Sequence, residues 1–383
     1  MTAPTQSRPL LPTLRRMAAG LVLAAVGGAL VWQGSTLRPT PGLQGVTTAF
    51  GAPLDGPLPL DVVHDARLRF QGQVGELQLR LSPLPATSPD VLRGEARHRE
   101  RNPLKYSDSR RARTLDAGTR LDVLPLQRGG VVVSGPEPFV HRVQAALTPR
   151  IPLTVTTLTG VGDQTLDLST LRLRALTART TSGALKVTLP ARPAGPLSLI
   201  TESGALTVNA PLISGQPGTR PEALRVNSRW GDVSLDLAGA ELGTLSVGNG
   251  SGAVRLTLPA RTDRGSLTTI SGDVTVTALA GSAGNLDIRT QTGTVTLKVP
   301  AGLRVRVRFT DRDTLTLPPS TAPGEAVPPH LDVFIDAPAD LFHLESDGVR
   351  AASPQSGLRR PPLPPLHTRS TGICMTCAPE APA

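Results

Sequence analysis

The stretch that decides the fold runs from Ser251 to Ala278 (SGAVRLTLPARTDRGSLTTISGDVTVTA) and holds two copies of one pattern. In each copy a Ser-Gly pair is followed by apolar residues two, four and six positions after the glycine. Alternation with a period of two is typical of a β-strand with one buried face. The glycine fits a turn, because glycine alone takes positive φ without penalty. The stretch therefore predicts strands that meet at glycine turns.

The same pattern occurs six times between residues 182 and 299, and successive glycines are 21, 27, 21, 20 and 21 residues apart. A second, shorter strand is expected before each glycine, with apolar residues seven and five positions ahead of it in most copies. A unit of this size cannot bury its own apolar face, so neighbouring units must stack. The sequence predicts an all-β solenoid of about 21-residue repeats. The pairs are Ser182-Gly183, Ser203-Gly204, Trp230-Gly231, Ser251-Gly252, Ser271-Gly272 and Thr292-Gly293.

One uncharged stretch lies between Arg16 and Arg38, and its apolar core is MAAGLVLAAVGGALVW (residues 17–32). At about 1.5 Å per residue it is roughly 31 Å long, which matches a bilayer core. Three arginines precede it and only Arg38 follows closely, which predicts a single-pass anchor with a cytoplasmic N-terminus and an extracytoplasmic remainder. A cleaved signal peptide is the alternative, although no clear A-x-A cleavage site follows.

The rest of the chain divides around the repeats. The expected parts are a basic cytoplasmic N-terminus (1–16), a transmembrane anchor (17–37), a linker (38–58), an N-terminal β subdomain with a charged loop (59–150), the solenoid domain (151–350) and a disordered Pro-rich tail (351–383).

The chain of 383 residues has a formal net charge of +10, which favours anionic lipid or an anionic cell-wall polymer as a partner. It has few aromatic residues, two Trp, one Tyr and six Phe. Single-stranded nucleic acid is normally bound on stacked aromatic side chains. No nucleic-acid partner is therefore expected.

The run from Leu147 to Pro190 (LTPRIPLTVTTLTGVGDQTLDLSTLRLRALTARTTSGALKVTLP), followed by SGALTV, SGAVRL and SGDVTV, resembles the bacterial "putative-adhesin" or toastrack β-repeat family. The resemblance covers roughly residues 60 to 345. It implies a right-handed β-helix-like stack, a place in the cell envelope and no assigned enzymatic activity. It implies no site residues, because the shared motifs are turn and core positions.

Residues with catalytic or metal-binding potential form no recognisable site. The six histidines are scattered, and no G-x-S-x-G motif occurs. Cys374 and Cys377 form a C-x-x-C that could be a redox or half-metal motif, but a tail disulfide or an incidental pair is the favoured interpretation. No cofactor, no metal and no catalytic residue is expected.

Two groups of arginines are the candidate contacts for an anionic partner. The stretch from Arg93 to Arg113 has a local net charge of about +5, and a solvated charged loop is the alternative. A second group alternates along one strand face near residue 306, where it could instead protect the last strand from edge pairing. The candidates are Arg93, Arg97, Arg99, Arg101, Arg110, Arg111, Arg113, Arg304, Arg306 and Arg308.

These observations favour a non-enzymatic protein that binds another envelope component (an envelope protein, anionic lipid or a cell-wall polymer), either as an adhesin-like or as an envelope-stress accessory module. A purely structural cell-surface spacer is the alternative. A polysaccharide-active β-helix enzyme is a third hypothesis, which carboxylates stacked on adjacent coils would support.

Overall fold

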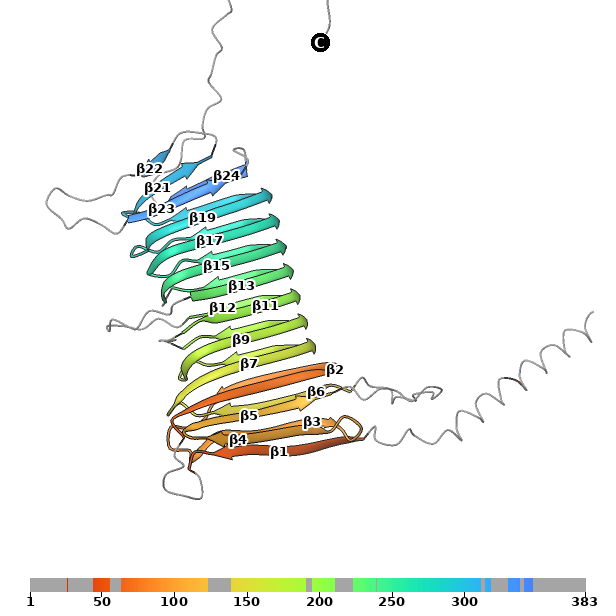
Figure 1. Cartoon of the computed structure of the whole chain (residues 1–383). Helices are drawn as coiled ribbons and strands as arrows, with labels where there is room; N and C mark the ends of the chain where they lie inside the picture. Colours follow the sequence, from red (N-terminus) through yellow and green to blue (C-terminus); the bar gives the residue numbers. More distant parts are fainter. Residues whose placement is uncertain are drawn as a thin grey trace, which may run out of the picture.

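A computed structural model describes residues 26, 44–55, 63–122, 139–190, 195–210, 223–238, 240–310, 314–317, 330–337 and 341–346. The described part of the chain forms 24 β-strands arranged in two ladders, sheet A and sheet B, which β2 joins because its two halves lie in different sheets. Figure 1 shows the strands stacked one above another into an elongated body.

Sheet A runs in the following order from one edge to the other: β1 (Gly45–Pro53), β3 (Asp90–Arg99), β6 (His141–Leu147), the second half of β2 (Asp65–Pro83), β8 (Gln164–Asp167), β10 (Leu185–Thr188), β12 (Leu206–Asn209), β14 (Val233–Asp236), β16 (Val254–Thr257), β18 (Val274–Thr277), β20 (Val295–Val299) and β24 (Phe342–Ser346). Its strands are parallel from β6 to β24, and β1, β3 and β6 pair antiparallel.

Sheet B runs in the same direction: β4 (Leu104–Arg111), β5 (Thr114–Leu121), the first half of β2, β7 (Pro152–Val161), β9 (Arg172–Ser182), β11 (Leu197–Ser203), β13 (Ala223–Trp230), β15 (Glu241–Ser251), β17 (Arg261–Ser271), β19 (Ala283–Thr292), β23 (His330–Asp336), β21 (Arg304–Phe309) and β22 (Leu315–Leu317). Only the two outermost pairs, β4–β5 and β21–β22, are antiparallel.

The chain alternates between the two sheets, and each repeat adds one strand to each. Equivalent repeat positions lie side by side, as in the row Val233, Val254, Val274 of sheet A. Seventeen of the eighteen apolar positions after the six glycines are buried, and Ala210 is half-buried. The predicted all-β solenoid is confirmed, whereas its right-handedness stays a prediction.

A column of glycines forms the corner where sheet B turns into sheet A. Gly231 has a φ of +141°, and a Cβ atom added there would collide with the backbone carbonyl of Gly204 in the preceding coil. Side chains are thus excluded by both conformation and space. The column consists of Gly162, Gly183, Gly204, Gly231, Gly252, Gly272 and Gly293.

The relative strand lengths within a repeat differ from the expectation. Strands before the glycine have 7 to 11 residues and those after it have 4 or 5, so the longer strand comes first. The reason is a polar row that faces inward three residues before each glycine. Four of its side chains donate to carbonyls at the corner: Thr290 Oγ1 donates to Thr292 O at 3.0 Å and Asn249 Nδ2 to Gly252 O at 2.9 Å, and Thr180 and Thr269 do the same at longer distances. The row consists of Thr159, Thr180, Thr201, Ser228, Asn249, Thr269 and Thr290.

Two expectations for the N-terminal half were wrong. Part of the expected linker (38–58) is β1, which pairs along its length with β3 and forms the edge of sheet A. The expected charged loop is mostly strand, because residues 93–113 cover most of β3, all of β4 and two connecting turns. Of the strands concerned, β1 and β4 are edge strands and β3 is second from the edge of sheet A, and none of them shows the apolar alternation of the repeats.

Other predictions fall on undescribed residues. No helix in the described part of the chain is long and apolar enough to cross a membrane. The anchor predicted at 17–37 lies outside the described residues apart from Val26, and so do the 351–383 tail, Cys374 and Cys377.

Candidate anion-binding groove

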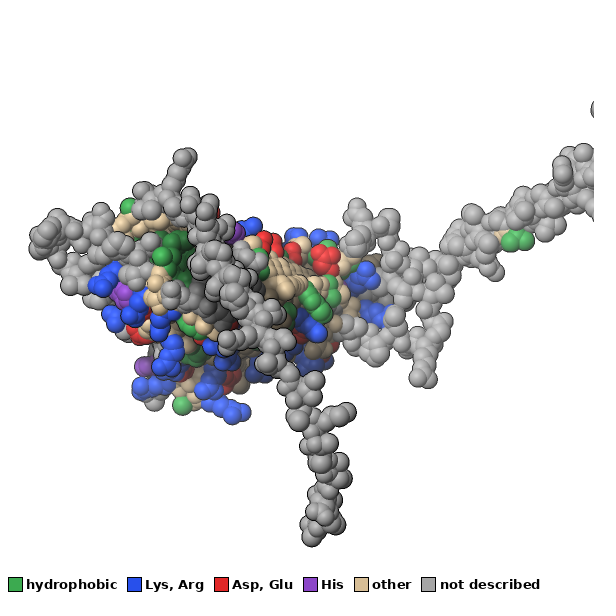
Figure 2. All heavy atoms as spheres, turned by 90° about the horizontal axis from the view of Figure 1, so that it is seen from above, with side chains coloured by type: hydrophobic (Ala, Val, Ile, Leu, Met, Phe, Trp, Pro, Cys, Tyr) green, Lys and Arg blue, Asp and Glu red, His purple; other side chains and the backbone are tan. Residues whose placement is uncertain are grey.

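The structure does not bring the predicted arginines together. Those of β3 belong to sheet A, those of β4 and its turn belong to sheet B, and those of β21 lie at the opposite end of the solenoid. Lys and Arg side chains (blue) are prominent on the lower side of the view in Figure 2. Positive charge is therefore spread over several surfaces instead of forming one docking loop.

Several predicted candidates have partners within the chain. Arg93 forms an ion pair with Asp90 at 2.5 Å, and Arg110 donates to the carbonyl oxygen of Pro53 at 2.6 Å. The guanidinium of Arg99 lies 5.2 Å from the ring centre of Phe139. These contacts tie the β3–β4 region to its neighbours.

At the far end, Arg306 is bound on both sides of its fork by the carboxylate of Asp332, at 2.6 and 2.8 Å. This hydrogen bond is the main reason why the pKa of Asp332 is lowered, and His330 contributes from 3.2 Å. The strand β21 lies between β23 and β22, so its arginines do not guard a free edge. Arg306 is best interpreted as a structural cross-link, and the edge-guard interpretation was wrong.

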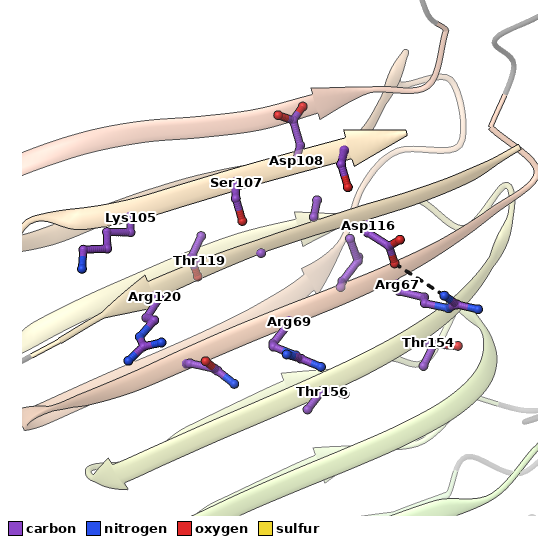
Figure 3. Close-up of a pocket in the computed structure, with 15 residues that line it drawn as sticks. Arg67, Arg69, Lys105, Ser107, Asp108, Asp116, Thr119, Arg120, Thr154 and Thr156 are labelled. Carbon is purple, nitrogen blue, oxygen red and sulfur yellow. Dashed lines mark ion pairs between the residues drawn. The ribbon is translucent and has the colours of Figure 1, made fainter. Parts of the chain in front are cut away.

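A groove of about 720 Å³ lies instead on the outer face of sheet B at the N-terminal end of the solenoid (Figure 3). It crosses β4, β5, β2 and β7, and the outward side chains of these strands line it. We call it the basic groove. Its outward residues are Arg67, Arg69, Gln71, Lys105, Ser107, Ser109, Asp116, Gly118, Arg120, Thr154 and Thr156.

Gly118 leaves the middle of the groove without a side chain. Strand register places Gly118 between Ser107 of β4 and Arg69 of β2, and Thr156 of β7 follows next to Arg69. A Cβ atom at Gly118 would lie 2.7 Å from the carbonyl oxygen of Arg69, so a side chain there would strain the backbone contact. The hollow is thus a consequence of one residue type at one register position.

The cations of the groove differ in how fully they are neutralised. Asp122 accepts from Arg120 at 2.6 Å and from Lys105 at 3.3 Å, and the Arg120 hydrogen bond is the main cause that lowers the pKa of Asp122. Arg67 is 3.9 Å from Asp116, and the Arg67 side chain is largely exposed, so this pair is weak.

Arg69 is different, because it is exposed and forms none of the ion pairs found in the described part of the chain. It borders the hollow, with the hydroxyl groups of Ser107 and Thr156 in the same row (Figure 3). A guanidinium presents a planar fork of donors that fits a carboxylate or phosphate, and hydroxyl groups can donate to the same anion. The arrangement suits reversible binding of an anion.

The groove is lined by basic, hydroxyl and amide side chains, and its carboxylates are Asp108 and Asp116. No histidine or cysteine is among the residues that line it. In the described ranges there is also no group of three His, Cys, Asp or Glu side chains that could hold a metal ion. The lining side chains can form hydrogen bonds and ion pairs with a ligand.

The other face of the same end carries a second basic spot. Arg97 of β3 lies directly opposite Arg142 of β6, and both are exposed on sheet A. Like charges in this relation are destabilising when no counter-charge is present. Arg142 donates to the side-chain oxygen of Gln78 at 3.2 Å, which orients it without neutralising it. Of the predicted arginines, Arg97 best keeps a binding role, since it has no carboxylate partner among the described residues and its guanidinium lies 5.7 Å from the ring centre of Phe139.

Sequence reasoning missed the residues of the basic groove. Alternation around Leu68 showed that Arg67 and Arg69 face outward, but it could not show that Gly118 lies beside Arg69. That neighbour comes from a strand about fifty residues away. The available signal was a strand with two outward arginines, which was not singled out.

Comparison with known proteins adds little. No protein-family model and no curated protein matches the chain. Among solved structures it is similar to a "putative cell adhesion protein" from Clostridium sporogenes ATCC 15579, with 10% identity, a TM-score of 0.31 and coverage of 79% of this chain and 100% of the other. It is also similar to a "putative adhesin" from Bacteroides fragilis NCTC 9343, with 8% identity, a TM-score of 0.30 and coverage of 81% and 100%. Likenesses of this size carry no argument about function.

Proposed function

We propose that the protein is a non-enzymatic binding module of the cell envelope, held in the membrane by its N-terminal anchor. Its basic groove binds an anionic cell-wall polymer. The observation that carries the proposal is Arg69, an exposed guanidinium without a carboxylate partner beside a hollow made by Gly118. Such a module can serve adhesion or an envelope-stress accessory role through the same contact.

The shape of the groove favours a polymer over a compact lipid headgroup. The groove crosses four strands, which corresponds to about 14 Å at a strand spacing of about 4.8 Å. Arg67 and Arg120 lie near its two ends, four residues apart in register and thus about 13 Å from each other. Arg69 lies between them in register and has no ion-pair partner in the described part of the chain, so an extended anionic chain would bind first at Arg69 and could compete with the weak Asp116 pair for Arg67.

The alternative functions have less support. A pure spacer gives no role to an exposed arginine beside an open hollow. For the enzyme hypothesis, the registers of the described strands place no two carboxylates directly opposite each other on neighbouring strands. The stacked carboxylates that would have favoured that hypothesis are thus not present in the described ladders.

Binding of the full-length chain to polygalacturonate and to linear polyphosphate tests the proposal, because these polymers carry carboxylate and phosphate groups respectively. Arg69→Gln should weaken binding at least about tenfold, and added salt should weaken it further. Arg255→Gln is the matched control, since Arg255 is an exposed arginine in the middle of sheet A.

Two outcomes would overturn the proposal. One is equal binding by Arg69→Gln and the unchanged protein. The other is binding to vesicles that contain phosphatidylglycerol but to neither polymer, which would assign the groove to a lipid surface.

A further inference from the structure

Trp230 stands at a position where the other five repeats between residues 182 and 299 have a small hydroxyl side chain. The residue just before the corner glycine is Ser182, Ser203, Ser251, Ser271 or Thr292 in those repeats, and Val161 precedes Gly162 in the coil before them. Trp230 lies between Ser203 of β11 and Ser251 of β15 in the register of sheet B. Its side chain is 52% exposed, so a large aromatic ring projects from a row of small hydroxyl groups.

Arg229 packs against the indole ring of Trp230, and about half of the residue's surface remains exposed to solvent. The guanidinium of Arg229 lies 4.3 Å from the ring centre, a close cation–π contact. The next strand has Gly250 at the register position beside Arg229, so no side chain rises there. A ring held in this way on a rigid sheet loses little conformational entropy when a ligand covers it.

The surroundings decide which ligand fits. Protein interfaces bury aromatic anchors at the centre of a larger apolar patch. In the described part of the chain, the strands on either side of β13 carry no exposed large apolar side chain, and beyond them Ile270 of β17 is a single exposed side chain and not a patch. The neighbours of Trp230 are the hydroxyl groups of Ser203 and Ser251, the charged Arg229 and the bare Gly250.

A pyranose ring has the complementary chemistry. One of its faces presents C–H groups that pack on an aromatic ring, and hydroxyl groups surround its edge. The indole can cover the C–H face. Ser203 and Ser251 are one strand away from Trp230 on either side, and Arg229 contacts its ring, so all three can form hydrogen bonds with the sugar hydroxyl groups. The indole ring and its polar neighbours thus complement the C–H face and the hydroxyl groups of a pyranose ring.

We propose that Trp230, with Arg229, Ser203 and Ser251, is a stacking site for a pyranose unit of a polysaccharide. The site is separate from the basic groove, since β13 is three strands from β7 along sheet B. At about 4.8 Å per strand this is about 14 Å along the stack, so a single sugar cannot occupy both. The two sites do not depend on each other.

The sequence makes this site easy to observe. Its only tryptophans are Trp32 and Trp230, so the full-length chain with Trp32→Phe has a single indole, located at the proposed site. The probes are hexasaccharides of β-1,4-linked glucose, mannose and N-acetylglucosamine. At least one should cause a saturable shift in tryptophan emission. Calorimetry with that sugar should show binding weakened at least about tenfold by Trp230→Ala and less by Trp230→Phe.

Controls separate this site from other effects. Val46→Ala removes an exposed apolar side chain on β1, at the N-terminal end of sheet A, and should leave sugar binding unchanged. Arg69→Gln should also leave it unchanged, although it weakens binding to polyanions. Trp230→Ala should retain the thermal midpoint because the side chain is exposed. No saturable emission shift with any of the three sugars, or equal affinity of Trp230→Ala, would overturn the proposal.

Discussion

Replacing Leu256 by alanine tests the solenoid core most directly. Leu256 is 1% exposed and lies between Leu235 of β14 and Val276 of β18 in sheet A. The change removes three carbon atoms, which corresponds to about 2.4 kcal/mol of transfer free energy at about 0.8 kcal/mol each. A residual cavity of up to about 80 Å³ adds up to about 1.9 kcal/mol when the neighbours do not relax. We expect the free energy of unfolding to fall by about 2.4 to 4.3 kcal/mol.

The assay is urea denaturation of the full-length chain followed by far-ultraviolet circular dichroism. Arg255→Ala is the matched control, because Arg255 is on the same strand, one residue earlier, and faces solvent. It should change the free energy of unfolding by no more than about 0.5 kcal/mol. Similar losses in both variants would refute the reasoning, because a strand with one buried face must distinguish adjacent residues.

Three further predictions follow from other parts of the structure. Gly231→Ala should destabilise the solenoid more than Gly281→Ala, whose Cβ would meet nothing within 4 Å, and thermal denaturation of both variants measures the difference. Burial lowers the pKa of His141, and the nearby Arg99 also lowers it, so the unfolded chain binds the proton more readily. The stability that the neutral His141 contributes should be complete above about pH 6.5 and fall as the pH drops below that value. In His141→Leu, the midpoint of urea denaturation should therefore change less between about pH 7.5 and 5 than it does in the unchanged protein. The pKa of Asp332 is lowered for a different reason: its charged form is stabilised by the hydrogen bond from Arg306, whereas the charged form of His141 is disfavoured by burial. The stability that Asp332 contributes should be complete above about pH 3.9 and be lost as the pH falls through its lower pKa in the folded protein. Asp332→Asn should increase hydrogen exchange in β21 and β23 at pH 7, whereas the control Arg304→Gln should not.

The repeat architecture was predictable because its causes are local. Period-two alternation fixes which face of a strand is buried, so residues such as Val254 and Leu256 could be assigned inward from the sequence. Glycine at the corner follows from a positive φ that other residues avoid, as at Gly252 with φ of +115°. Both features are written in neighbouring residues.

The strand lengths were not predictable from apolar pattern alone. Thr269 and Asn249 face inward three residues before their glycines, but a polar residue ends an apolar alternation in the sequence. These side chains are tolerated in the interior because several bond to corner carbonyls, which removes much of the cost of burying a polar group. Only the folded corner supplies those acceptors.

By itself, the sequence determined the all-β class, the 21-residue coil, the buried face of each repeat and the glycine corner. The tertiary structure alone decided that Gly118 lies between Ser107 and Arg69, that Asp332 neutralises Arg306, and that Trp230 stands between two serines. The physical reason is that strand alternation is a local property, whereas the partner of each strand and its register depend on contacts between distant residues. Binding surfaces on a β-solenoid are built from such cross-strand neighbours, so they appear only when the coils are stacked.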